Sequence, residues 1–172
     1  MSRQILLFFL FSSAFFCPGY GQKANSPDCF DIALEAFTNM INEKEADAYR
    51  LAKWHLDNCL HSEYWFRNTH MLLAESGMAL RKYQEVIDGM TAFIESDKSK
   101  DSEQAAEAYF FRAIARKDGR IGTMEDSFED LKQYRELIAK IRETNPEYCS
   151  ENQGKIDYAN GIYEVLCGYL KK

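Results

Sequence analysis

The sequence predicts an all-α protein made of helices that pair into antiparallel hairpins. Behind the N-terminal segment, apolar side chains recur at the three- and four-residue spacing of helices almost to the end of the chain. Glycine and proline, which interrupt helices, number only 9 and 3 among 172 residues. The stretches YWFR (64–67) and YFFR (109–112) are nearly alike, which predicts that the helices form a repeat.

The N-terminal segment has the layout of a secretory signal peptide. One positive charge at Arg3 precedes a short apolar run over residues 5–16, which is too short for a typical membrane span. Gly19 and Gly21 supply the small residues that signal peptidase requires, so we expect residues 1–21 to be removed. The exported protein, periplasmic or secreted, would then be one domain of residues 22–172.

A lipoprotein attached through Cys17 is the alternative form of export. Bacterial lipoprotein signals have a small residue before the modified cysteine, whereas Phe16 stands there in this chain. We therefore favour a cleaved signal peptide over a lipid anchor.

The exported chain is acidic. The full sequence has 21 basic and 27 acidic residues and a net charge of −6, and removing Arg3 with the signal would make it −7. An acidic domain without a basic stripe is poorly suited to nucleic acid or to an anionic membrane surface. We expect no nucleic-acid binding and no stable membrane insertion after signal cleavage.

Four cysteines remain in the exported domain, and helix geometry favours one pairing. Cys29 and Cys59 are equally far from the expected turn between the first two helices, so an antiparallel hairpin brings them close together. Cys149 and Cys167 flank the last expected helix, roughly 25 Å apart at 1.5 Å per residue. We predict a Cys29–Cys59 disulfide and no bridge between Cys149 and Cys167.

Seven helices are expected from apolar periodicity and from residues that start or stop helices. Ser26 and Pro27 would start the first, with Asp28 in its first turn, and Ser150 with Gln153 would form a capping box for the last. The expected helices cover residues 27–43, 45–60, from Ser62 to about Leu80, 83–94, 103–118, from the turn at 119–123 to Asn145-Pro146, and from Gln153 to Leu170.

The repeat has an apparent period of 45 residues. A gap-free shift by 45 aligns the two aromatic stretches and also pairs Tyr83 with Phe128, Val86 with Leu131 and Phe93 with Ile138. In each copy the aromatic stretch would begin the first helix of a hairpin. The preceding segment matches less well, at a shift of 34 residues. The alternative is that two amphipathic hairpins share an apolar pattern by chance.

The segments AYFFRAIARKDG (108–119) and KYQEVIDGMTAFI (82–94) resemble the first and second helices of a tetratricopeptide repeat (TPR). The resemblance extends over about residues 30–142 and implies an α-solenoid of about three antiparallel hairpins, with a C-terminal capping helix. The chain departs from the family in its period, which is 45 rather than 34 residues. It also has Asn68 where a small residue is expected and Ser127 where the family often has alanine. A HEAT-like array would also fit.

The resemblance implies a binding surface for a protein or peptide. In the TPR pattern, Trp65 and Phe110 would point into a concave groove, with Thr69, Ile114 and Lys117 further along it. Three consecutive aromatic side chains span about 200° of a helix, so all members of a triad cannot face one core. We expect most of both triads in the interior and at least one member of each exposed or between hairpins.

Two groups of polar residues suggest a metal or an acid–base site, and each has a simpler explanation. His55 and Cys59 lie on one helix face, and Cys29 and His61 could complete a zinc site, but the expected disulfide uses both cysteines. The segment MEDSFED (124–130) places four carboxylates at the start of a helix, where the macrodipole favours negative charge. We expect no metal and no cofactor.

The sequence therefore favours an exported interaction or scaffold module over an enzyme. It contains no nucleophile elbow, zinc-protease motif, P-loop or dinucleotide-binding glycines, and His70 is isolated. Alternatives are a helical module for a small ligand or metal, and an exported inhibitor that docks on an enzyme. An enzyme dependent on Glu129 or His70 ranks last.

Replacing Cys29 with alanine (Cys29→Ala) should lower the midpoint of thermal unfolding under oxidising conditions. The lost cross-link is worth about 2–4 kcal/mol, chiefly through the unfolded state. Under a reducing agent the variant and the wild type should unfold at nearly the same temperature, because neither holds a bridge. Thermal unfolding followed by circular dichroism measures both, and equal effects in the two conditions would contradict this account.

Overall fold

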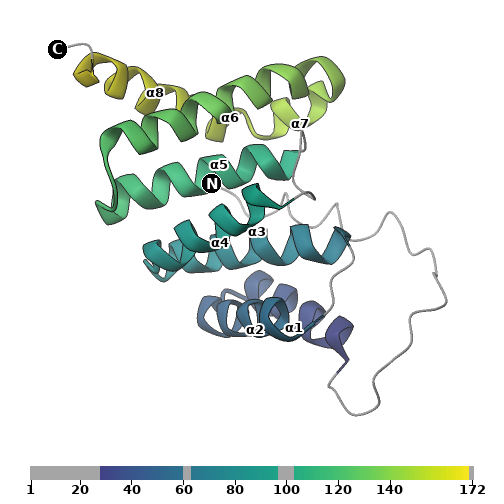
Figure 1. The fold of residues 1–172 in the computed structure, drawn as a ribbon. Coiled ribbons are helices and arrows are strands. Elements are labelled where there is room, and N and C mark those ends of the chain that lie inside the picture. Colours follow the sequence, from purple (N-terminus) through teal and green to yellow (C-terminus); the bar gives the residue numbers. More distant parts are fainter. Residues whose placement is uncertain (1–27, 60–62, 97–102, 171–172) are drawn as a thin grey trace.

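The computed structural model describes residues 28–59, 63–96 and 103–170, and within these ranges every regular element is a helix (Figure 1). The all-α class is thus confirmed. The expected signal peptide (1–21), the helix start at Ser26 and Pro27, the cap at Ser62 and the loop 97–102 lie outside the described residues.

Eight helices are described where the sequence predicted seven. They are α1 (Cys29–Ile41), α2 (Glu45–Asn58), α3 (Glu63–Ala79), α4 (Tyr83–Glu95), α5 (Glu103–Gly119), α6 (Met124–Thr144), α7 (Pro146–Glu151) and α8 (Gln153–Leu170). The additional helix α7 follows the expected stop of α6. Asn145 accepts a hydrogen bond from the Tyr148 N–H (3.2 Å), and Pro146 occupies the first helical position, so the residues that end α6 also start α7.

Two expected helix starts were wrong in detail. Asp28 is not in the first turn of α1 but caps it, since its carboxylate accepts a hydrogen bond from the Phe30 N–H (3.0 Å). Ser150 does not cap the last helix, because it lies inside α7. The Asn152 carbonyl instead accepts the first backbone bonds of α8.

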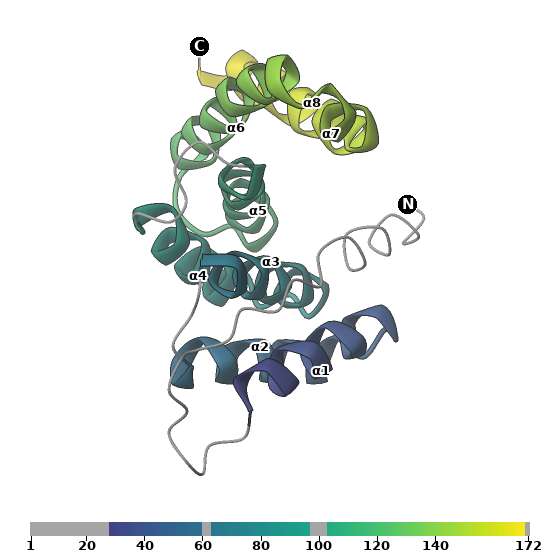
Figure 2. The ribbon, with the colours of Figure 1, turned by 90° about the vertical axis from the view of Figure 1, so that its right-hand side faces the viewer.

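The helices are packed in sequence order. Each helix contacts the next, and α3 also packs on α1 and α5, while α8 packs on α6. Seen in Figure 2, they follow an arc from α1 to α8. Three apolar clusters fill the spaces between them: one joins α1, α2 and α3, a second α3, α4 and α5, and a third α5, α6, α7 and α8.

The last described helix, α8, has an outer face that is only partly polar. Gln153, Asp157 and Glu164 are exposed there, but Tyr158, Val165 and Tyr169 are also about half exposed or more. Terminal helices of stacked arrays generally present polar outer faces to water. α8 therefore occupies the position of the expected capping helix without the surface typical of a cap.

One disulfide joins the start of α1 to the end of α2, as predicted. Cys29 and Cys59 are bonded, with their Cα atoms 5.9 Å apart. Because the bridge connects opposite ends of consecutive helices, α1 and α2 are antiparallel. Cys149 and Cys167 are free thiols, the first of them buried, which confirms that they do not pair.

The helices α1, α3 and α5 end in the same left-handed turn. Glu43, Arg81 and Arg120 have φ angles of 60°, 58° and 54°, a conformation that usually favours glycine. Each is followed by a backbone bond that spans five residues, the signature of a Schellman motif. These bonds run from Lys44 N–H to Asn39 O (2.9 Å), Lys82 N–H to Gly77 O (2.8 Å) and Ile121 N–H to Arg116 O (3.0 Å).

These turns define the true register of the hairpins. They follow one another at intervals of 38 and 39 residues. Seven residues before each turn stands an alanine, Ala36, Ala74 or Ala113, and all three are completely buried. A small side chain at this point lets a neighbouring helix approach closely, so the three hairpins share one local design.

The 45-residue period was therefore wrong. Tyr64 lies in the first turn of α3, as expected, but Tyr109 lies well inside α5, which begins at Glu103. The two aromatic stretches sit at different heights on their helices, and their likeness does not reflect the register of the hairpins. None of the described helices is both long and apolar enough to cross a membrane.

Replacing Arg81 with glycine (Arg81→Gly) should stabilise the protein. An L residue in the left-handed region costs about 1–2 kcal/mol, which glycine avoids. Part of this gain is offset because glycine has more conformational entropy in the unfolded chain. We expect a net gain of about 0.5–1 kcal/mol in the free energy of unfolding, measured in urea. Arg81→Ala, which keeps the strained backbone, should bring no gain; a gain with alanine too would implicate the arginine side chain instead.

Candidate functional site

Three of the five residues expected in a concave groove lie in the core. Thr69, Phe110 and Ile114 are 1%, 8% and 5% exposed. The Thr69 hydroxyl is 3.3 Å from Nδ1 of buried His55, and the Phe110 ring lies 5.5 Å from that of Tyr134. As placed, these side chains support the packing of helices and offer almost no surface to a partner.

The other two expected groove residues, Trp65 and Lys117, retain exposed surface. Trp65 is half-buried and packs edge-on against Phe30 of α1, with ring centres 5.6 Å apart. Lys117 lies near the end of α5 and pairs with Asp118. Burial alone would lower the pKa of Lys117, but the Asp118 carboxylate raises it above its ordinary value. The binding role of both residues stays a prediction.

The two aromatic triads differ in burial. Tyr64 is 55% exposed while Trp65 and Phe66 are half-buried, which confirms that one member of the first triad faces water. In the second triad no member is fully exposed, because Tyr109 and Phe111 are half-buried and Phe110 is buried. The residues of the second triad are sheltered in part by Tyr158 of α8, whose ring centre is 6.5 Å from that of Phe110.

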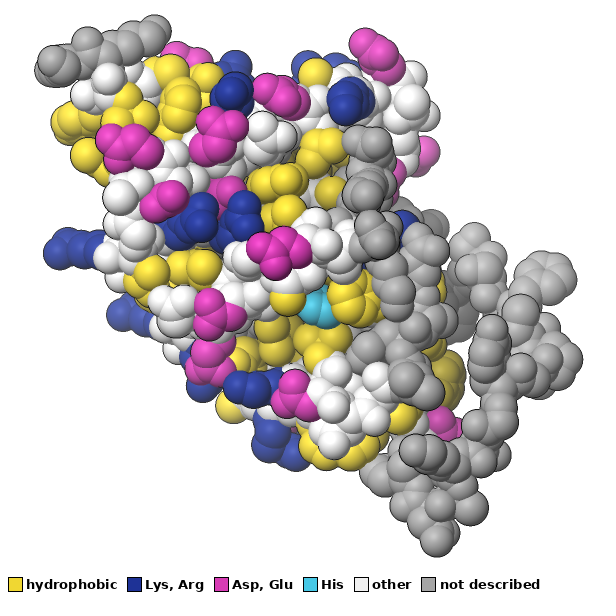
Figure 3. Space-filling view, in the orientation of Figure 1, with side chains coloured by type: hydrophobic (Ala, Val, Ile, Leu, Met, Phe, Trp, Pro, Cys, Tyr) yellow, Lys and Arg dark blue, Asp and Glu magenta, His cyan; other side chains and the backbone are white. Residues whose placement is uncertain are grey.

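A groove that the sequence did not predict lies between α2 and α4. These two helices both pack on α3 but scarcely on each other, so α3 forms the floor of an open cavity of about 420 Å³. Figure 3 shows apolar side chains and a histidine gathered there, with charged side chains around them. The lining residues are Tyr49, Lys53, Leu56 and Asp57 of α2, Phe66, His70 and Leu73 of α3, and Glu85, Asp88 and Gly89 of α4.

Gly89 brings α4 close to the floor of this groove. A Cβ atom at this position would lie 2.7 Å from Cδ2 of buried Leu73, so a larger residue would force the Leu73 side chain to shift. A lone glycine within a helical pattern was the one sequence signal of this contact. The other groove residues come from three helices and share no local motif.

Glu85 organises one end of the groove. Its carboxylate accepts a hydrogen bond from the Tyr49 hydroxyl and pairs with Lys53 (3.3 Å) and Lys82 (3.1 Å). The bond from Tyr49 and the two lysines lower the pKa of Glu85 to about 2. Burial, followed by the bond to Glu85, raises the pKa of Tyr49. Glu85 therefore stays ionised at neutral pH and is fully engaged by its own chain.

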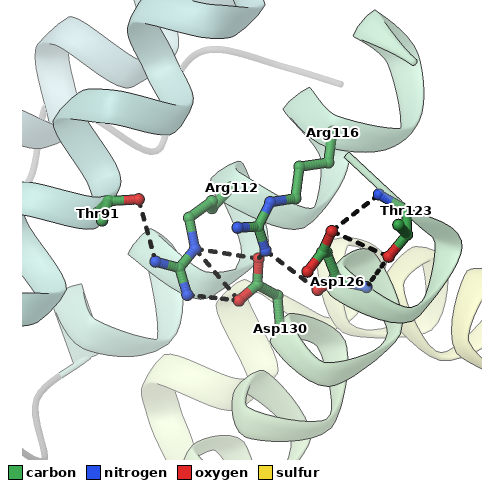
Figure 4. Close-up of polar contacts among 6 residues, drawn as sticks. All are labelled: Thr91, Arg112, Arg116, Thr123, Asp126 and Asp130. Carbon is green, nitrogen blue, oxygen red and sulfur yellow. Dashed lines mark hydrogen bonds and ion pairs between the residues drawn. The ribbon is translucent and has the colours of Figure 1, made fainter. Parts of the chain in front are cut away.

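A second polar network joins the second and third hairpins (Figure 4). Arg112 of α5 contacts the Asp130 carboxylate through Nε (3.0 Å) and Nη2 (2.6 Å), and Arg116 reaches the same carboxylate at 2.6 Å. Arg112 also donates to the Thr91 hydroxyl of α4 (3.1 Å). Asp130, only 4% exposed in its side chain, thus ties α4, α5 and α6 together.

The acidic segment 124–130 therefore has two separate structural roles. Asp126 forms a capping box with Thr123 at the start of α6, and bonds from the Thr123 backbone and side chain lower the pKa of Asp126. Asp130 forms the buried ion pair, which the sequence analysis did not foresee. A simple macrodipole explanation was thus incomplete, because one carboxylate of the four is buried between helices.

The two cysteines that were considered as zinc ligands are bonded to each other. Cys29 and Cys59 form the disulfide, and His61 lies outside the described residues. In the described part of the chain no cluster of three or more histidine, cysteine or acidic side chains is arranged to hold a metal. His70 is buried and its Nδ1 lies 2.8 Å from the Phe66 carbonyl, which is a packing contact within α3.

Comparison with known proteins adds no relative. No protein-family model, no curated protein and no solved structure matches this chain. The candidate site is thus defined by the geometry alone: it is the open groove of α2, α3 and α4. The structure does not bring Trp65, at the start of α3, together with Lys117, near the end of α5.

Replacing Asp130 with asparagine (Asp130→Asn) should strongly destabilise the protein. The change leaves two arginines partly buried without their countercharge, and breaking a buried pair in this way costs about 3–5 kcal/mol. Urea unfolding measures the loss. Glu129→Gln is the matched control. This exposed carboxylate on the same helix pairs with Lys132 (3.4 Å) and accepts a hydrogen bond from the Gln133 amide (3.1 Å), and it should matter by less than about 0.5 kcal/mol. A similar loss in the free energy of unfolding for both variants would show that Asp130 does not link the helices.

Proposed function

We propose that this protein is an exported, TPR-like interaction module that binds a protein or peptide partner and has no catalytic activity of its own. Its hairpins would form a short α-solenoid, in which each hairpin buries the apolar face of its neighbour. This architecture is supported by three hairpins that have the same turn between their two helices and a buried alanine at the same distance before that turn. So do the contacts of α3 with both α1 and α5.

The observation that carries the proposal is the open groove of α2, α3 and α4. Its floor, formed by Phe66, His70 and Leu73, is mostly apolar. Lys53, Asp57 and Asp88 at its edge are exposed to solvent. Small-molecule sites usually enclose most of their ligand. A surface groove with an apolar floor and charged rim is better suited to a side chain or segment of another protein.

Export is supported by two independent features. Residues 1–21 have the charge and apolar pattern of a signal peptide, and the described part contains the Cys29–Cys59 disulfide. Disulfides persist in oxidising compartments and are rare in the cytosol. We propose that the protein works in the periplasm or outside the cell.

Site-specific photo-cross-linking in the native host would test this function. A photoreactive residue replaces Lys53 at the groove, Lys117 on α5, or Glu136 on the exposed surface of α6 as the matched control. We expect one dominant protein adduct, identified by mass spectrometry, from Lys53 or Lys117 and none from Glu136. Absence of a specific adduct at both test positions, with the tagged protein recovered as an unliganded monomer, would overturn the proposal.

A further inference from the structure

We infer that the groove of α2, α3 and α4 binds a cationic side chain with an apolar stem, arginine above all, presented by the partner. The inference rests on the proposed function and adds the chemistry of the partner. It depends on three properties of the groove: carboxylates at the rim that pair with no cation of the described residues, a mostly apolar floor and a rigid lining.

The rim carries more negative charge than the chain itself neutralises. Of its three carboxylates, only Glu85 is paired with lysines, and it engages both Lys53 and Lys82. Asp88 accepts a hydrogen bond from the neutral Gln84 amide (2.8 Å). Among the described residues neither Asp57 nor Asp88 forms an ion pair, and both are exposed.

The two carboxylates stand on different helices, with the apolar floor between them. Asp57 belongs to α2 and Asp88 to α4, and both line the same cavity. A guanidinium group offers five N–H donors in a planar fork, so it can contact carboxylates on two sides at once. A lysine ammonium is a compact point charge and lacks this geometry.

The floor suits the stem of such a side chain. Leu56, Phe66 and Leu73 provide apolar surface, and Gly89 projects no side chain into the space. Long basic residues bury their methylene groups along apolar surface while the charged head stays near water. The overall net charge of −6 would also favour the approach of a basic segment.

The lining is held in place before any partner arrives. The Phe66 ring stacks on buried Phe93, with centres 5.7 Å apart, and the Tyr49 hydroxyl is fixed by Glu85. A preorganised site loses less conformational entropy on binding. The groove is therefore a defined receptor for one side chain and not merely a gap between two helices.

The test uses three short peptides and the folded protein. The acetylated and amidated peptide Gly-Leu-Arg-Leu-Gly is compared with versions that carry citrulline or glutamate at the centre. Citrulline keeps the length and shape of arginine but has no charge. We expect the arginine peptide to shift the Gly89 amide signal and those of nearby residues in NMR titrations, and to bind about tenfold more tightly than the citrulline peptide.

Variants of the two rim carboxylates test whether they bind the arginine side chain of the peptide. Asp57→Asn and Asp88→Asn should each weaken binding of the arginine peptide roughly five- to tenfold and leave the citrulline peptide unchanged. Glu136→Gln, which removes one exposed charge far along the sequence on α6, should change neither. Because all three positions are exposed, unchanged amide spectra of the free variants verify the fold.

Two results would overturn the inference. Equal binding of the arginine and citrulline peptides would show that charge is not recognised, and equal loss in Glu136→Gln would show that only net charge matters. These failures differ from failure of the proposed function. A specific cross-link from Lys117 alone, with no peptide binding at the groove, would keep the interaction module and reject this site.

Discussion

The fold depends on one backbone feature, the left-handed turn that ends α1, α3 and α5. At Glu43, Arg81 and Arg120 the chain reverses through the same Schellman bonds, although none of these residues is glycine. Each turn fixes how the next helix lies on the one before it. All three turns adopt this strained conformation. Its conformational cost is offset by the helix packing around the buried alanine that precedes each turn.

The groove and the Asp130 network are consequences of this packing. Since α2 and α4 each follow such a turn and pack on α3, they flank it without closing over it. On the other side of α4, Asp130 pairs with Arg112 and Arg116 within the α5–α6 hairpin, and Arg112 links this hairpin to Thr91 of α4. The Asp130 carboxylate is thus engaged inside the helix packing, whereas Asp57 and Asp88 are exposed at the surface.

The residues that resemble a TPR groove serve the interior in this chain. Thr69, Phe110 and Ile114 are buried by contacts with neighbouring helices, and only Trp65 and Lys117 keep exposed surface. The proposed binding surface moves accordingly to the side where α2 and α4 stand apart. The resemblance thus agrees with an all-helical chain packed in sequence order, whereas three of the five residues that it assigns to a groove lie in the core.

The sequence by itself determined the helices, most of their limits and the Cys29–Cys59 bridge, because helical periodicity and the geometry of one hairpin are local properties. It did not determine the register of the hairpins. YWFR and YFFR are alike in composition but lie at different positions on their helices, whereas Arg81 and Arg120 occupy equivalent turns, which only their backbone angles reveal. Nor could it place Asp57, Glu85 and Asp88 around one cavity, because they belong to helices whose relative positions are set by contacts with α3. Only the tertiary structure decided which polar residues are buried links between helices and which are exposed to solvent, because burial depends on neighbours that are distant in the sequence.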